Sequence, residues 1–118
     1  MSDFKNKLEI WVAGMLKKID KYARPSKASG ASTESYDIQT EIPLAIECKI
    51  NRTNLNPVIR MITWDKLLNE IPMRSKRTPV LFIQNTHGKR FAVLDAEDFF
   101  NDFLYEMYES EEKWRIKF

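Results

Sequence analysis

Apolar and polar positions alternate most regularly between residues 36 and 50, where the pattern predicts two short strands joined by a turn near Pro43. Successive side chains of a strand point to opposite sides. One face of the second strand therefore carries Leu44, Ile46, Cys48 and Ile50, and the other carries Ala45, Glu47 and Lys49. A carboxylate and an ammonium group thus share one face of a strand whose other face is apolar.

The rest of the chain alternates between helical and strand patterns, which indicates an α/β fold. The pattern at residues 3–21 predicts an amphipathic helix capped by Ser2 or Asp3, with Glu9 at the edge of its apolar face. The further expected elements are an edge strand at 22–26, a helix from Pro57 to about Ile71 capped by Asn56, strands at 79–84 and 90–94 forming a hairpin, and a helix from Asp95 to about Glu109. The second helix is expected to bury Val58, Met61, Ile62, Leu67 and Leu68.

Length and composition place the chain among ordinary globular proteins. Its 118 residues, 43% of them hydrophobic, suit a single domain spanning residues 1–118. No apolar run approaches the roughly 20 residues of a membrane span, and the N-terminus has no secretory signal pattern. Cys48 is the single cysteine, so neither an internal disulfide nor a zinc cluster is expected. We expect a cytoplasmic protein in a reducing compartment, with no membrane contact and no organic cofactor.

Charge is unevenly distributed along the chain. Residues 1–94 hold 16 Lys/Arg against 9 Asp/Glu, whereas residues 95–118 hold 3 against 8. A basic body favours a polyanionic partner, although scattered solubilising charge would explain the same counts. The basic residues that flank the central strands are Arg24, Lys27 and Arg52, and we expect them to contact phosphate.

The candidate chemistry lies in Asp37, Glu47 and Lys49. If the two central strands pair, Asp37 lies beside Glu47, and two carboxylates with a lysine suit a divalent metal that activates water against a phosphodiester. With 10 Glu and 12 Lys in the chain, one Glu-x-Lys arises by chance, and a second copy is present at residues 111–113. The evidence for a metal site is therefore the combination of Asp37, a turn, an apolar strand and then Glu-x-Lys. The alternative is a solvated strand face with a chance salt bridge.

The order of these features resembles the PD-(D/E)xK nuclease superfamily, and within it the archaeal-type Holliday junction resolvases and their viral relatives. The resemblance covers most of residues 3–105, with Tyr36 where a Pro or Gly usually precedes the aspartate and a short turn at Pro43. It implies a restriction-endonuclease-like core, with a central mixed sheet of about five strands flanked by helices. A virus-encoded protein in a host cell would also fit.

The resemblance further implies the roles of individual residues. Asp37, Glu47 and the Cys48 backbone carbonyl would hold Mg²⁺, for which Mn²⁺ could substitute, and Glu9 would assist a second ion or a bound water. Lys49 would orient the attacking water. Ser29 and Ser32 lie in the loop where the family places a catalytically helpful serine.

The expected activity is paired, symmetric nicking of four-way DNA junctions, which requires a homodimer. Apolar residues between 99 and 108 exceed one narrow helical stripe, which makes them candidate dimer contacts. In the tail at 110–118, residues 113–118 alternate basic and apolar, which suits a dimer contact or an added edge strand, with a frayed terminus as the alternative. Two alternatives remain open. One is a nuclease for another substrate such as a flap, a nick or a duplex site, and the other is a non-catalytic DNA-binding or assembly protein.

Overall fold

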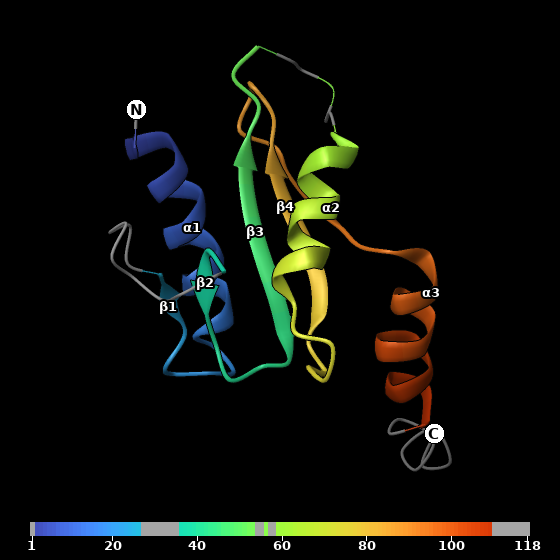
Figure 1. Ribbon diagram of the computed structural model, residues 1–118. Coiled ribbons are helices and arrows are strands. Elements are labelled where there is room, and N and C mark those ends of the chain that lie inside the picture. Colours follow the sequence, from blue (N-terminus) through green and yellow to red (C-terminus); the bar gives the residue numbers. More distant parts are fainter. Residues whose placement is uncertain (1, 27–35, 54–55, 57–58, 110–118) are drawn as a thin grey trace.

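The computed structural model describes residues 2–26, 36–53, 56 and 59–109 (Figure 1). Its elements in chain order are α1 (Ser2–Leu16), β1 (Arg24–Pro25), β2 (Ile38–Gln39), β3 (Leu44–Ile50), α2 (Met61–Glu70), β4 (Thr78–Gln84), β5 (Arg90–Val93), α3 (Ala96–Asp98) and the π-helix η1 (Phe99–Leu104). The predicted α/β class is confirmed. Within the described ranges, no helix is long and apolar enough to cross a membrane.

The centre of the fold is a three-stranded sheet in the order β3-β4-β5. β3 and β4 are parallel, with Ile46 opposite Val80 and Glu47 opposite Leu81, and α2 connects them as the crossover of a βαβ unit. β5 returns antiparallel to β4, as the predicted hairpin requires. The turn between them contains Gly88 at φ 82°, a backbone conformation that glycine adopts without steric cost.

The two faces of this sheet are covered by different helices. Ile46 and Cys48 point toward α1 and form a buried cluster with Leu8 and Val12, so the predicted apolar face of β3 is confirmed. The intervening residues of β3 and β4 point the other way, toward α2. Glu47 and Lys49 consequently lie on the α2 side of the sheet, and in Figure 1 the sheet separates the two helices.

α1 ends at Leu16, five residues before the predicted end. Turns follow, and Asp20 N–H still donates to the Leu16 carbonyl at 2.8 Å. Ile19, which lies within the predicted helix but beyond the end of α1, is 79% exposed. Within these turns the Asp20 side chain accepts a hydrogen bond from the Tyr22 N–H at 3.0 Å.

The expected single sheet of five strands is wrong. The described residues contain five strands, but β1 and β2 form a separate antiparallel pair, with Arg24 opposite Gln39. β2 approaches β3 without joining it as a ladder strand. Asp37, just before β2, makes this contact: its N–H donates to the Ile46 carbonyl at 3.0 Å.

α2 begins at Met61, later than the predicted start at Pro57. Residues 57 and 58 lie outside the described part of the chain. The predicted buried stripe is also wrong in part: Leu67 is buried, whereas Met61, Ile62 and Leu68 are exposed. Helical spacing identified an apolar face, but the position of the helix over the sheet leaves a large part of that face uncovered.

The C-terminal helical segment begins as predicted. Asp95 Oδ1 accepts hydrogen bonds from Glu97 N–H at 2.9 Å and Asp98 N–H at 3.2 Å, which caps α3. Burial, together with the charges of Asp95, Asp102 and Glu97, raises the pKa of Asp98. The expected apolar surplus is confirmed by the large exposed side chains Phe99, Phe100, Leu104, Tyr105, Met107 and Tyr108.

Asp20 ties the end of α1 to the turn that precedes β3. Its carboxylate accepts hydrogen bonds from Thr40 Oγ1 at 2.5 Å, from Glu41 N–H at 2.8 Å and from Tyr22 N–H at 3.0 Å. The hydrogen bond from the Thr40 hydroxyl, followed by that from the Glu41 N–H, lowers the pKa of Asp20 below its ordinary value of 3.8.

We predict that Asp20 stabilises the fold in a pH-dependent way. Because the native pKa lies below the unfolded value, the stabilisation is complete above the unfolded value and is lost as pH falls through the native pKa. Asp20→Asn should therefore be less stable than the parent protein at neutral pH, and the difference should shrink below about pH 4. Urea unfolding at several pH values measures this, with Asp65→Asn on the exposed face of α2 as control. A pH-independent difference would contradict the prediction.

Candidate functional site

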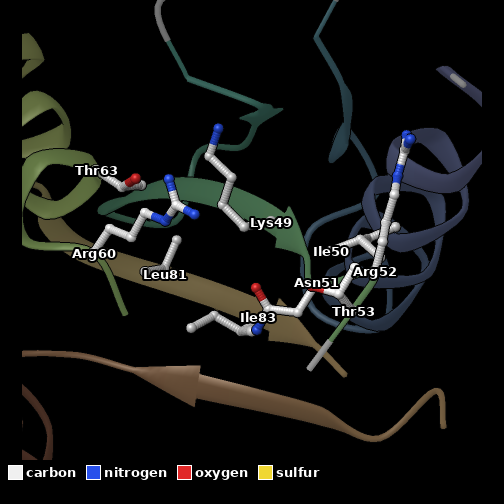
Figure 2. A pocket seen from close by; sticks show the side chains of 9 residues that line it. All are labelled: Lys49, Ile50, Asn51, Arg52, Thr53, Arg60, Thr63, Leu81 and Ile83. Atoms are coloured by element: carbon white, nitrogen blue, oxygen red, sulfur yellow. The ribbon is translucent and has the colours of Figure 1, made fainter. Parts of the chain in front are cut away.

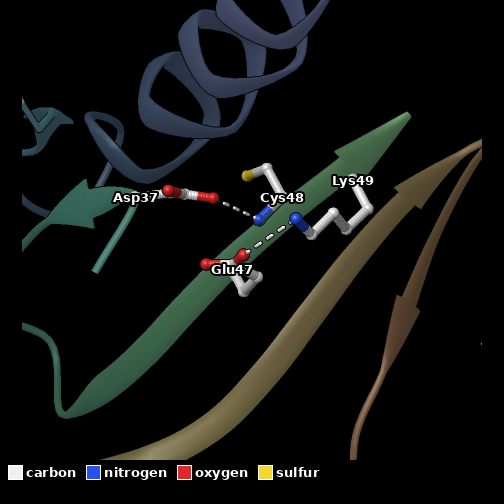
Figure 3. A network of polar contacts seen from close by, with 4 residues as sticks. All are labelled: Asp37, Glu47, Cys48 and Lys49. Atoms are coloured by element: carbon white, nitrogen blue, oxygen red, sulfur yellow. Dashed lines mark hydrogen bonds and ion pairs between the residues drawn. The ribbon is translucent and has the colours of Figure 1, made fainter. Parts of the chain in front are cut away.

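Asp37 is fixed to the outer edge of β3 by two hydrogen bonds. Besides the bond from its own N–H to Ile46, its Oδ2 accepts from the Cys48 N–H at 2.8 Å (Figure 3). The Asp37 carboxylate thus takes the place that a neighbouring strand's carbonyl would occupy. Asp37 is consequently brought next to Cys48, the residue that follows Glu47, although β2 and β3 do not pair as the sequence analysis expected.

Glu47 and Lys49 form an ion pair on the α2 side of β3. Lys49 Nζ lies 3.4 Å from Glu47 Oε2, with 45% of the Lys49 side chain and 11% of the Glu47 side chain exposed. Figure 3 shows both side chains extending from the strand that Asp37 borders. The carboxylate is therefore held near the protein interior while the ammonium group reaches the surface.

Cys48 contributes to the site through its backbone. Its side chain is buried in the cluster with α1, as predicted. The N–H and C=O of one strand residue point to the same edge of the strand. Because the Cys48 N–H points toward Asp37, the Cys48 carbonyl also points to this edge rather than toward β4.

Glu9 is 6% exposed and lies on α1, which packs against β1, β2 and β3. The structure therefore buries Glu9 on the helix beside the strand that carries Glu47. Among the described residues, however, no three side chains of Asp, Glu, His or Cys form a group that could hold a metal ion. Asp37 therefore lies beside β3, the strand that carries Glu47, and Glu9 does not join these two carboxylates in a metal-binding group.

The remaining predicted site residues are spread more widely. Ser29, Ser32 and Lys27 lie outside the described residues. Arg24 is exposed on β1, and Arg52 is exposed in the loop that follows β3. His87 is exposed in the hairpin turn between β4 and β5.

A cavity of about 370 Å³ adjoins Lys49. It is lined by Lys49, Ile50, Asn51, Arg52, Thr53, Arg60, Thr63, Leu81 and Ile83. Arg60 was missed by the sequence analysis, which placed residue 60 inside a helix beginning at Pro57. The structure instead makes Arg60 the residue before α2, with extended backbone at φ −91° and ψ 126°.

Arg77, which lies between α2 and β4, has a structural role. Its guanidinium donates to the carbonyls of Leu44 at 2.7 Å, Ile42 at 3.0 Å and Thr40 at 2.8 Å. These bonds hold the turn that leads into β3. A planar guanidinium offers several donors in fixed directions, so one side chain satisfies all three carbonyls.

Comparisons with known proteins identify no relative. No protein-family model, no curated protein sequence and no solved structure matches the chain.

We predict that Arg77 is needed for stability rather than for contact with nucleic acid. A lysine ammonium cannot reproduce the three bonds, so Arg77→Lys should lower the free energy of unfolding by roughly 1–3 kcal/mol. Arg74→Lys, at an exposed position in the same connector, should change it by less than about 0.5 kcal/mol. Urea denaturation compares the two variants. Equal stability of Arg77→Lys and the parent protein would show that the three bonds are dispensable.

Proposed function

We propose that the chain is a metal-dependent endonuclease that cuts branched DNA, with four-way junctions as its preferred substrate. The observation that carries the proposal is the attachment of the Asp37 carboxylate to the N–H of Cys48, the residue between Glu47 and Lys49. Two acidic residues and a lysine, separated in sequence, are thereby assembled at one strand. The basic character of residues 1–94 supports a polyanionic substrate.

The residues present fit Mg²⁺ in the proposed site. Mg²⁺ takes oxygen ligands and keeps several waters, so it needs only one or two carboxylates from the protein. Asp37 and Glu47 would supply these, and the Cys48 carbonyl, which points to the Asp37 edge, would supply a third oxygen. Mn²⁺ would be accepted by the same ligands. A bound divalent ion would lower the pKa of a water and offset charge on the phosphate.

The chain's own groups would perform the remaining tasks. Asp37 is held in position by the Cys48 N–H, so its carboxylate needs little reorganisation to act as a ligand. Lys49, whose side chain is 45% exposed, would orient the attacking water and balance negative charge on the phosphate. Glu9, if it takes part, would do so through a water.

The proposed relationship to the PD-(D/E)xK superfamily implies a restriction-endonuclease-like core. It is supported by the order of elements, in which α1 precedes the strand with Glu47 and Lys49 and α2 then crosses to a parallel strand. The division of the strands into two sheets departs from the expected single sheet. Fold by itself does not determine substrate, so the junction preference rests on the resemblance.

Paired nicks require two sites, so we propose a two-fold homodimer. The exposed apolar residues of the C-terminal helical segment support this, because a contiguous apolar surface is typical of subunit contacts. In Figure 1 this segment extends beyond the sheet, on the side away from α1.

We predict that cleavage depends on Asp37 and Glu47. Asp37→Asn and Glu47→Gln should each reduce Mg²⁺-dependent nicking roughly 1000-fold, because several kcal/mol of transition-state stabilisation is lost. Asparagine keeps an oxygen that can accept the Cys48 N–H bond, so Asp37→Asn should fold normally. Glu41→Gln, at an exposed position before β3, is the control.

The assay compares four-way junction, duplex, flap and nicked DNA, with Mg²⁺, with Mn²⁺ and with chelator. Paired nicks confined to junctions would support the proposal. Metal-dependent cutting of every substrate would indicate a less selective nuclease, and tight binding without cutting would indicate a non-catalytic DNA-binding protein. Full activity of either variant in saturating Mg²⁺ would refute the assignment of its carboxylate.

We predict that the parent protein sediments at twice the monomer mass at micromolar concentration. The double variant Phe100→Glu/Leu104→Glu should sediment as a monomer, because charge would then occupy the proposed contact. Ile19→Glu, at an exposed apolar position on the other side of the sheet, should remain dimeric. A monomeric parent protein would contradict the homodimer.

A further inference from the structure

The cavity next to Lys49 has the character of an anion site. Of its nine lining residues, three are cationic (Lys49, Arg52 and Arg60) and none is acidic. Asn51, Thr53 and Thr63 add hydrogen-bonding groups, while Leu81 and Ile83 belong to β4 beneath them. Cationic and neutral polar groups above an apolar floor suit the oxygens of a phosphate group.

The cationic groups differ in direction. Figure 2 shows Arg60 and Lys49 reaching toward the same space above Leu81, whereas Arg52 extends away from it. Arg60 makes no ion pair with any residue in the described ranges. The guanidinium of Arg60 is thus directed into the cavity, and no carboxylate of the described residues neutralises it.

The start of α2 adds to the positive potential at Arg60. α2 has ten residues, no acidic residue in its first turn and no side chain that caps it. Its first N–H groups therefore leave a partial positive charge beside the cavity.

Asn51 adds a polar side chain to the wall of the cavity. Its amide oxygen lies on the side of Lys49 and Arg60, and its nitrogen lies on the side of Ile83 (Figure 2). The anion-binding character of the cavity therefore rests on its cations and on the start of α2.

We infer that this cavity binds a backbone phosphate of the DNA strand, beside the phosphate that is cut. Arg60 would be the main contact, and Lys49 would be shared between the cavity and Glu47. Glu47 and Lys49 lie two residues apart on one face of β3, so their Cα atoms are about 7 Å apart along the strand. The choice of DNA rests on the proposed function, and the bound phosphate would set the register of the strand over Glu47 and Asp37.

The test measures binding without cleavage. Affinity for a four-way junction is titrated in chelator at several salt concentrations, for the parent protein and for Arg60→Gln, Arg60→Lys and Lys66→Gln. Lys66 is an exposed cation on α2 that does not line the cavity. Arg60→Gln should weaken binding roughly tenfold and reduce the slope of log affinity against log salt by about 1. Arg60→Lys should keep the slope, and Lys66→Gln should bind within about twofold of the parent.

A second arm separates DNA from free phosphate. Thermal unfolding is followed with inorganic phosphate at constant ionic strength. Stabilisation by phosphate that Arg60→Gln loses, with junction affinity unchanged, would show a site for free phosphate and overturn the DNA assignment. Unchanged affinity and slope in Arg60→Gln would also overturn it, even if the parent protein cuts junctions. Weakened binding by Arg60→Gln in a protein that cuts nothing would support the cavity assignment while refuting the nuclease.

Discussion

The arrangement of the candidate site depends on the hydrogen bond between the Asp37 carboxylate and the Cys48 N–H. β3 is an edge strand of its sheet, and an edge strand presents backbone groups that require partners. Asp37 supplies one partner with its side chain and another with its own N–H, which donates to Ile46. The same contacts bring the small β1-β2 sheet against the larger one and place a carboxylate beside Glu47's strand.

The hydrogen bonds that position Asp37 in the candidate site are therefore also contacts that hold the two sheets together. Asp37 has a structural hydrogen bond independent of any metal, and Glu47 has its ion pair with Lys49. An ion pair near the protein interior contributes little net stability, because desolvation of the charges offsets their attraction. With the Lys49 side chain 45% exposed, this pair therefore adds little to the stability of the fold.

The basic residues show how similar sequence features acquire different roles. Arg77 donates hydrogen bonds to three backbone carbonyls at the turn before β3, so its guanidinium is used within the protein. Arg60 is directed into the cavity beside Lys49, whereas Arg52 extends away from it. Net charge along the chain does not distinguish these cases, because it ignores which acceptors the fold brings within reach.

The sequence by itself determined the elements whose patterns are local. Alternation defined the two faces of β3, an uninterrupted apolar run defined β4, and Asp95 marked the start of the last helical segment, because each depends on residues close together in the chain. The sequence also predicted Asp37 beside Glu47, and the structure places the Asp37 carboxylate on the N–H of Cys48, the residue after Glu47. Only the tertiary structure decided that β2 pairs with β1 instead of extending the larger sheet, that α2 starts at Met61, and that Arg60 rather than Arg52 faces the cavity. These outcomes depend on contacts between distant segments, and the spacing of residues along the chain does not encode which of several compatible partners is reached.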